Sequence, residues 1–427
     1  MKQPNIVMIL TDDQGCADYS AYGTPDIRTP NIDRIFHEGM TFTNFFANSP
    51  VCSPSRAALL TGCHPDRVGV PGVIRHIEAN SWGYLSPNCT LLPQTLKQQG
   101  YHSALVGKWH LGLKSPNLPN ERGFDFFHGF LGDMMDDYWT HLRGGNNYMR
   151  LNNTVIEPEG HATDLFTTWA CEYLQERSRI EQPFFLYLAY NAPHDPVQPP
   201  QEWLERVMER EPHMDPKRQK LVALIEHLDA GIGRVLDTLD QTGLTENTLV
   251  VFSSDNGGVL ANGANNGPWR SEKGHVYDGG LRVPCAARWP ARIAPNTKSA
   301  YLGMIMDLFP TFAEAAGAVV GDDIDGCSLL PVMLGQTSEE VRREMYFVRR
   351  EGGAAYAGKT IEAIREGDWK LLQDSPFQKL ELYNVQEDPY EEVDRAGDAK
   401  HVFRDLAAKL RKHIQRGGET PWQEPRH

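Results

Sequence analysis

Four short runs of apolar residues, separated along the chain by helical patterns, constrain the fold most strongly. Each run has apolar side chains at consecutive positions, which is typical of a strand buried on both faces. The four runs are residues 5–10, 103–106, 184–189 and 248–253. Apolar residues from Leu221 to Leu239 recur every three or four positions and predict an amphipathic helix. This alternation predicts an α/β fold with a large, mostly parallel sheet between helices.

The hydrophobic pattern changes after about residue 338. Three segments alternate like antiparallel strands: residues 345–349, 361–365 and 369–373. A helical pattern follows over residues 402–416, with Gly417 as its expected stop. We therefore predict a large α/β domain over residues 1–338 and a smaller C-terminal α+β subdomain over residues 339–427.

Charge and cysteine usage exclude several classes of partner. A formal net charge of -14 argues against nucleic acid or an anionic membrane. The apolar run at residues 6–10 is too short for a signal peptide, and no stretch approaches a membrane span. We expect a cytoplasmic protein, or a periplasmic or secreted one if a leader was removed. The 7 scattered cysteines predict neither a disulfide framework nor a zinc site.

Polar residues follow each of the four predicted strands. The clusters are residues 12–15, 107–110, 191–194 and 255–258. Ligands of open α/β sheets bind in the crevice beyond the carboxyl ends of the strands. A single cluster is well explained as a solvated turn, but four at the same edge of one sheet predict a functional site.

Two of these clusters contain oxygen ligands of the kind that hard cations prefer. Asp12, Asp13, Asp255 and Asn256 offer carboxylate and amide oxygens. Such a set suits Ca²⁺, with Mg²⁺ as the second choice, and argues against zinc. The alternative is that Asp12 and Asp255 cap the helices that follow them.

The segment from Cys52 to Gly62 predicts a short helix that begins just after Cys52. Pro54 suits the first helical position and Gly62 the C-terminal cap. Cys52 would then lie at a helix N-terminus, which favours an anion, with Arg56 one turn further on. A buried structural cysteine is one alternative. A thiolate phosphatase is another, but its nucleophile and arginine should bracket a wider loop.

The same segment resembles the modification signature of the formylglycine-dependent (type I) sulfatases, Cys-x-Pro-Ser-Arg followed by Leu-Thr-Gly. The matching residues are Cys52, Pro54, Ser55, Arg56, Leu60, Thr61 and Gly62. Further family elements are present at residues 12–13, 107–112, 193–194 and 254–257. The resemblance implies an alkaline-phosphatase-like fold and a sulfuric ester hydrolase.

A later segment, residues 267–280, resembles the branch that contains arylsulfatase A and N-acetylgalactosamine-6-sulfatase. Two departures from the family pattern stand out. Residues 63–67 also fit a minimal Cys-x-Pro-x-Arg pattern, but lack the serine and the Leu-Thr-Gly tail, so we interpret them as coincidental. His275 replaces a residue that is often threonine, which adds a titratable group to the expected pocket.

The resemblance also implies a mechanism. A formylglycine-generating maturation enzyme would oxidise Cys52 to an aldehyde, whose hydrate holds one hydroxyl on the metal for attack on sulfur. Cys52 thereby joins Asp12, Asp13, Asp255 and Asn256 as a metal ligand. His194, aided by Lys273, would protonate the leaving oxygen, and His110 would accept a proton as sulfate leaves. Arg56, Lys108 and Lys273 would attract the sulfate despite the negative net charge.

The substrate predicted from the branch resemblance is a sulfated saccharide. Candidate contacts are Arg75, His76, Asp133, Asp136, Tyr138, Trp139, His141, Arg143 and His275. A surface loop packed on itself is the alternative for residues 129–153. Other functions remain open: a phosphonate monoester or phosphodiester hydrolase of the same superfamily, sulfotransfer to an acceptor alcohol, or a non-catalytic binder of sulfated glycans.

Overall fold

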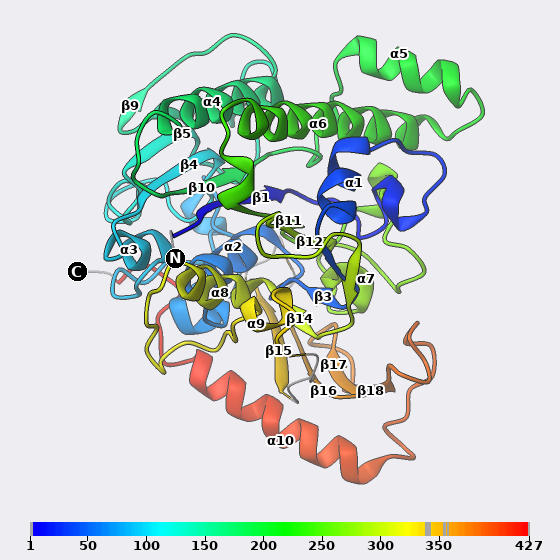
Figure 1. The fold of residues 1–427 in the computed structure, drawn as a ribbon. Helices are drawn as coiled ribbons and strands as arrows, with labels where there is room; N and C mark the ends of the chain where they lie inside the picture. The colour runs from blue at the N-terminus through cyan, green and yellow to red at the C-terminus, as the bar shows by residue number, and fades with distance from the viewer. Residues whose placement is uncertain (1–2, 338–342, 353–355, 357, 426–427) are drawn as a thin grey trace.

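A sheet of ten strands forms the centre of the protein in the computed structural model, which describes residues 3–337, 343–352, 356 and 358–425 (Figure 1). Five adjacent strands run parallel: β11 (Thr248–Ser254), β1 (Asn5–Thr11), β10 (Phe184–Ala189), β4 (His102–Lys108) and β5 (Phe126–Phe130). The four apolar runs are thus β1, β4, β10 and β11, which confirms the predicted α/β sheet.

Shorter strands extend the sheet at both edges and were not predicted. One edge adds β12 (Cys285–Arg288), β2 (Met40–Phe42) and β13 (Thr297–Ser299), and the other adds β8 (Met149–Leu151) and β9 (Thr154–Val155). β12 pairs antiparallel with β11, and β8 pairs antiparallel with β5. Two small ladders lie outside the sheet: β3 (Phe45–Phe46) with β14 (Gly303–Met304), and β6 (Leu142–Arg143) with β7 (Asn146–Asn147).

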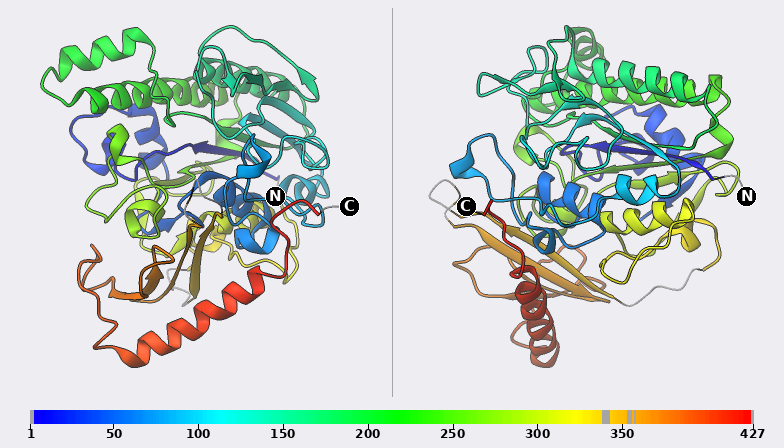
Figure 2. Two further views of the ribbon diagram at one scale, coloured as in Figure 1. Left: turned by 180° about the vertical axis from the view of Figure 1, so that it is seen from behind. Right: turned by 90° about the vertical axis from the view of Figure 1, so that its left-hand side faces the viewer.

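Helices cover both faces of the large sheet, as Figures 1 and 2 show. One face packs on α1 (Pro30–His37), α4 (Ala162–Arg177) and α6 (Pro216–Gln241), with α5 (Gln201–Arg210) against α6. The other packs on α2 (Cys52–Thr61), α3 (Leu92–Lys97) and α8 (Leu308–Ala315), with α9 (Leu330–Met333) against α8. In β1, Val7 and Ile9 face the first layer, whereas Ile6, Met8 and Leu10 face the second.

The C-terminal part forms the predicted antiparallel sheet and helix. Its elements are β15 (Glu344–Arg350), β16 (Thr360–Glu366), β17 (Trp369–Gln373), β18 (Glu381–Asn384) and α10 (Lys400–Gly417). One face of this sheet packs on α10 through Leu406 and Leu410. The other face packs on the large α/β part, where Phe347 contacts Phe46. The predicted boundary at residue 338 lies outside the described residues and stays a prediction.

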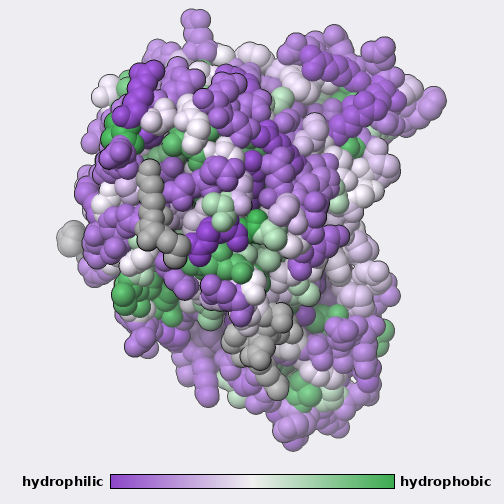
Figure 3. Space-filling model, in the orientation of Figure 1, coloured by the Kyte–Doolittle hydropathy of each residue, from purple (hydrophilic) through white to green (hydrophobic). Residues whose placement is uncertain are grey.

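Polar residues cover most of the face in Figure 3, and the apolar residues on it form small, separate patches. None of the described helices combines the length and the apolar character that crossing a lipid bilayer requires. The remaining helix, α7 (Asp278–Leu281), lies beside β3 and faces the C-terminal sheet (Figure 1). This contact brings residues from both parts of the chain to the same region of the molecule.

Candidate active site

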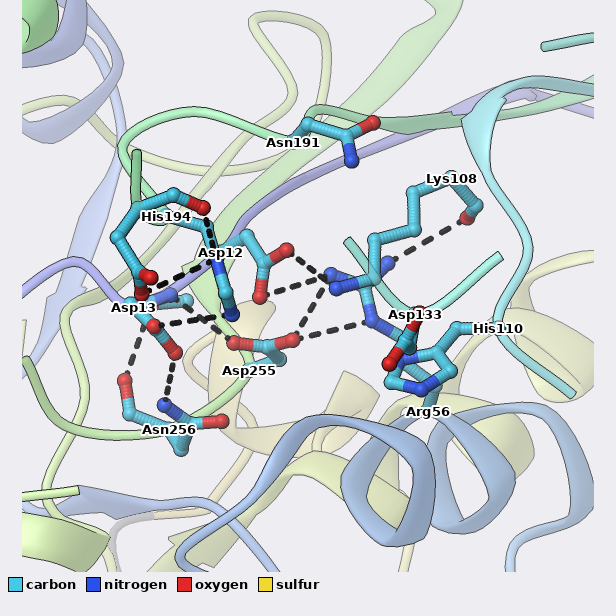
Figure 4. Close-up of polar contacts among 12 residues, drawn as sticks. Asp12, Asp13, Arg56, Lys108, His110, Asp133, Asn191, His194, Asp255 and Asn256 are labelled. Carbon is cyan, nitrogen blue, oxygen red and sulfur yellow. Dashed lines mark hydrogen bonds and ion pairs between the residues drawn. The ribbon is translucent and has the colours of Figure 1, made fainter. Parts of the chain in front are cut away.

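Side chains that follow four adjacent strands meet at one edge of the large sheet (Figure 4). They are Asp12 and Asp13 beyond β1, Lys108 at the end of β4 and His110 after it, His194 after β10, and Asp255 and Asn256 after β11. Each is at most 7% exposed, so their polar atoms face one another instead of solvent. The predicted convergence of the four clusters is therefore present in the fold.

Cys52 is the first residue of α2, and it is buried. Val51 is the N-cap, so Pro54 is the third helical residue and not the first, as the sequence suggested. Gly62 ends the helix with a φ of 70°, as expected of a left-handed C-cap. Burial raises the pKa of the Cys52 thiol although Lys273 and Lys108 oppose the shift. Burial thus disfavours the thiolate form at this position.

Arg56 lies one turn along α2 and is fully buried. Its Nε and Nη2 both donate to Oδ2 of Asp255, at 3.0 and 2.8 Å, and Nη2 lies 3.6 Å from Oδ1 of Asp12. Burial and the charge of Asp12 raise the pKa of Asp255 to about 7, and Arg56 opposes that shift. The guanidinium thus anchors a carboxylate of the site in a charge-assisted contact.

Two lysines hold the other carboxylates. Lys108 Nζ lies 2.5 Å from Oδ2 of Asp12, and Lys273 Nζ lies 2.6 Å from Oδ2 of Asp13. Lys273 Nζ is also 3.1 Å from Nε2 of His194, whose Nδ1 lies 2.6 Å from the carbonyl oxygen of Asp195. His194 therefore donates from Nδ1 to that carbonyl and keeps Nε2 toward Lys273 and the centre of the site.

His110 is held in one tautomer by the backbone. Its Nε2 lies 2.8 Å from the carbonyl oxygen of Ile74, so the ring proton is on Nε2. Nδ1 is buried and has no hydrogen-bond partner among the described residues. Burial, Lys108 and Arg56 hold the pKa of His110 well below its ordinary value. The ring is consequently neutral, with an unused lone pair on Nδ1.

The oxygens at the centre fit a divalent cation. Ligand atoms of Asp12, Asp13, Cys52 and His194 all lie within 4.8 Å of one another. Oδ1 of Asp12 and Oδ1 of Asn256 are buried without a hydrogen-bond partner among the described residues. Such oxygens are costly to bury unless an ion or water meets them. The set suits a hard cation, and it brings in His194, which the sequence reasoning kept out of the metal site.

Comparison with known proteins agrees with this geometry. The family model described as Sulfatase matches residues 4–318, which is more than half of the chain. The chain belongs to the sulfatase family. A second model, described as N-sulphoglucosamine sulphohydrolase, C-terminal, matches residues 269–418 of the sulfatase. The protein is therefore a sulfuric ester hydrolase, as the sequence resemblance implied.

Curated relatives and solved structures extend the likeness along the sulfatase. The dog (Canis lupus familiaris) N-acetylgalactosamine-6-sulfatase is 35% identical over 390 residues, which cover 86% of this chain and 71% of that protein. Human arylsulfatase A is 34% identical, and the match covers 86% of this chain and 74% of that protein. The crystal structure of Ps i-CgsB in complex with k-i-k-neocarrahexaose matches with a TM-score of 0.89 and 30% identity, over 99% and 95% of the two chains.

The predicted substrate contacts of the sulfatase fall into two groups. Tyr138 and His141 are 1% and 3% exposed and bond to backbone carbonyls, and their contact with a ligand stays a prediction. The carbonyls belong to Asn191 and His194 for Tyr138 and to Gly160 for His141, so both rings bond to segments beyond the loop. Arg143 bonds to Asp133 and Asp136, as expected of a loop packed on itself. Trp139 is 49% exposed.

Of the other candidates, Arg75 and His275 contact the C-terminal part, whereas His76 contacts Asp133 within the large α/β part. His76 Nδ1 lies 3.9 Å from Oδ1 of Asp133, Arg75 contacts Glu351, and Nδ1 of His275 lies 2.6 Å from Oδ2 of Asp374.

Sequence reasoning missed the residues that the C-terminal sheet places beside the site. Arg349 bonds to the carbonyl oxygen of Gly274, directly after Lys273, and Glu351 pairs with both Arg349 and Arg75. These residues lie at the end of a strand whose alternation indicates packing, and no local motif distinguishes them. A prediction of how the C-terminal sheet docks would have been needed to find them.

Proposed function

We propose that this sulfatase releases inorganic sulfate from a sulfated saccharide, with a formylglycine derived from Cys52 as nucleophile and Ca²⁺ as the cation. The observation that carries the proposal is the position of Cys52, which begins a buried helix and lies within 4.8 Å of ligand atoms of Asp12, Asp13 and His194. A thiol that carried the sulfate would have no second hydroxyl through which to expel it, whereas the hydrated aldehyde offers two hydroxyls.

Asp12, Asp13, Asp255 and Asn256 are the side chains that would hold the cation, together with residue 52. Calcium is favoured over magnesium because it accepts more oxygen ligands and less regular geometry. When bound, the cation supplies a Lewis acid that makes the attacking hydroxyl more acidic and offsets the charge of the three carboxylates. Lys108 and Lys273, each paired with one of these carboxylates, add positive charge beside the expected position of the sulfate.

Two histidines would transfer protons at different stages of the reaction. Nε2 of His194 faces the site and lies 3.1 Å from Lys273 Nζ, so this pair can deliver a proton to the leaving oxygen. Nδ1 of His110 carries an unused lone pair, so this ring can take up a proton as sulfate leaves residue 52. The backbone carbonyls of Asp195 and Ile74 fix the two tautomers that these roles require.

A carbohydrate substrate is supported by relatives at 30% identity or above. The matched curated relative is named N-acetylgalactosamine-6-sulfatase, and the matched crystal structure contains a neocarrahexaose. A phosphonate monoester or phosphodiester hydrolase is the alternative function. Lys108, Lys273 and His110 stand in elements that match the sulfatase pattern and favour sulfate, as do the relatives named as sulfatases.

The test has two parts. Peptide mass spectrometry across residue 52 should find formylglycine in active enzyme, and fully active enzyme with unmodified Cys52 would rule out the mechanism. Sulfate release from a panel of defined sulfated mono- and disaccharides, measured by ion chromatography, should exceed turnover of matched phosphonate esters. A large preference for the phosphonate esters would contradict the proposed substrate.

A further inference from the structure

Two cationic side chains of the C-terminal part, Arg349 and Lys359, lie close to Gly274, the residue that follows Lys273. A methyl group built on Gly274 would lie 2.8 Å from Nη1 of Arg349 and 4.0 Å from Nζ of Lys359. Arg349 Nη1 also donates to the carbonyl oxygen of Gly274 at 3.2 Å. Because Lys273 directs its ammonium group at Asp13 and His194, these two cations lie beside the catalytic centre but outside it.

Arg75 brings a third cation to the same place from the catalytic part of the chain. Its Nη1 lies 2.5 Å from Oε2 of Glu351, and its guanidinium lies 4.2 Å from the centre of the Tyr356 ring. The other oxygen of Glu351 accepts from Nε of Arg349 at 2.7 Å. Glu351 is 1% exposed, so one buried carboxylate serves two guanidinium groups.

The Lys359 ammonium has no carboxylate within ion-pair distance in the part of the chain that the structure describes. The two nearest acids are engaged elsewhere: Asp374 with His275, and Glu351 with the two arginines. Partial burial and Arg349 lower the pKa of Lys359, although Asp374 and Glu351 oppose the shift. Three cations thus share one directly paired carboxylate with Asp374 nearby, which leaves at least one positive charge uncompensated in a partly desolvated place.

One of the three cations, Arg75, borders a cavity that has room for further sugar rings. The cavity has a volume of about 1160 Å³, and Arg75, His76, Trp82 and Tyr84 lie in its wall. Ile74, whose carbonyl oxygen holds His110, also lies in its wall. A substrate with its sulfate ester at residue 52 could therefore extend past Arg75 without leaving the protein surface.

We propose that Arg75, Arg349 and Lys359 bind a second anionic group of the substrate, a sulfate or carboxylate on the same or a neighbouring sugar. The proposal rests on the proposed carbohydrate function and narrows its substrate class to saccharides with at least two anionic groups. Charge-assisted hydrogen bonds from a guanidinium and an ammonium suit both kinds of anion. Lys359 pairs with no carboxylate among the described residues, so its charge is the one that such a group would compensate most.

The test compares dissociation constants by calorimetry in the full chain with Cys52→Ala, so that no probe is hydrolysed. The probes are one disaccharide with a single sulfate ester, the same disaccharide with two, and the same with one sulfate ester and one carboxylate. We expect at least one of the doubly anionic probes to bind about tenfold more tightly than the single-sulfate probe. The doubly anionic probe that binds more tightly shows whether the second anionic group is a sulfate or a carboxylate.

Lys359→Met should remove most of that preference and Lys359→Arg should keep it. The matched control is Lys379→Met, because Lys379 lies in the same part of the chain and is paired with Asp394 at the surface. Equal binding of all three probes by the protein with Lys359 would overturn the proposal, and so would a full preference in Lys359→Met. Sulfate release from the single-sulfate disaccharide by the enzyme with Cys52 tests the carbohydrate function separately.

Discussion

The hydroxyl of Tyr138 lies 2.9 Å from the carbonyl oxygen of His194 and 2.8 Å from that of Asn191. The ring is buried and stacks on His161 at 5.0 Å, and the backbone NH of Tyr138 donates to Oε1 of Gln198. One rigid phenol therefore ties down both ends of the turn that presents the His194 ring to the active site. Tyr138 is a positioning residue for His194.

Replacement of this tyrosine should impair proton delivery more than binding. In Tyr138→Phe, kcat for phenyl sulfate should fall about tenfold, with a much smaller fall for 4-nitrophenyl sulfate, because a good leaving group needs little protonation. Steady-state rates across aryl sulfates of graded leaving-group acidity measure this. Tyr101→Phe is the matched control, since its buried hydroxyl bonds to the carbonyl oxygen of Pro4, before β1 begins. A uniform loss across the series would contradict the role.

Removal of divalent cations should destabilise the protein as well as inactivate it. Three carboxylates converge at the site, so a cation at a hundred times its dissociation constant should add about 2.7 kcal/mol to the free energy of unfolding. Thermal unfolding with chelator, with Ca²⁺ and with Mg²⁺ measures the shift, and Ca²⁺ should give the larger one.

Asp13→Asn should abolish the cation-dependent shift. Asp164→Asn should keep it, because Asp164 belongs to a separate group with His161 and His227. If the shift disappeared in Asp164→Asn and survived in Asp13→Asn, the cation would bind at the Asp164 cluster, and the prediction would be wrong.

Lys370 should be critical for docking of the C-terminal sheet. Its Nζ lies 2.6 Å from Oδ1 of Asp278, in α7, and 2.7 Å from Oε1 of Glu391, and all three side chains are buried. Lys370→Met leaves these two carboxylates facing each other, so chemical denaturation should show a loss of about 3–5 kcal/mol. The exposed Lys379→Met should cause no measurable change. Similar small effects for both variants would show that the buried pairs contribute little to docking.

His64 should make the protein sensitive to acid. Burial lowers its pKa to about 3, and its ring packs against Tyr346 and His413 of the C-terminal part. Since the folded pKa lies below the unfolded value, the contribution to stability is present above pH 6.5 and is lost as the pH falls. By pH 5 the loss from this group should reach about 2 kcal/mol.

Unfolding free energies at pH 7 and pH 5 test this prediction. His64→Phe should flatten the dependence over that range, and replacement of the exposed His401 should leave it unchanged. An unaltered slope in His64→Phe would show that other groups cause the acid sensitivity.

Much of the large sheet could be predicted because its strands are buried on both faces and therefore carry unbroken apolar runs. β10 was predicted to the residue, and β1, β4 and β11 to within one or two residues at each end. The edge strands β2, β8, β9 and β13 are two or three residues long, too short to show a period. They form because neighbouring strands offer backbone hydrogen-bond partners, and a local sequence pattern does not indicate such partners.

The sequence by itself determined which residues can form the centre of this sulfatase. Asp12, Asp13, Cys52, Arg56, Asp255 and Asn256 stand in contiguous motifs, and the strand ends that carry the acids must meet if the sheet is parallel. Only the tertiary structure decided that Arg56 holds Asp255, that Tyr138 supports the turn of His194, and that Arg349 and Lys359 reach Gly274. Those contacts depend on packing between segments far apart in the chain, and packing is set by the three-dimensional fit of whole surfaces, which no local motif encodes.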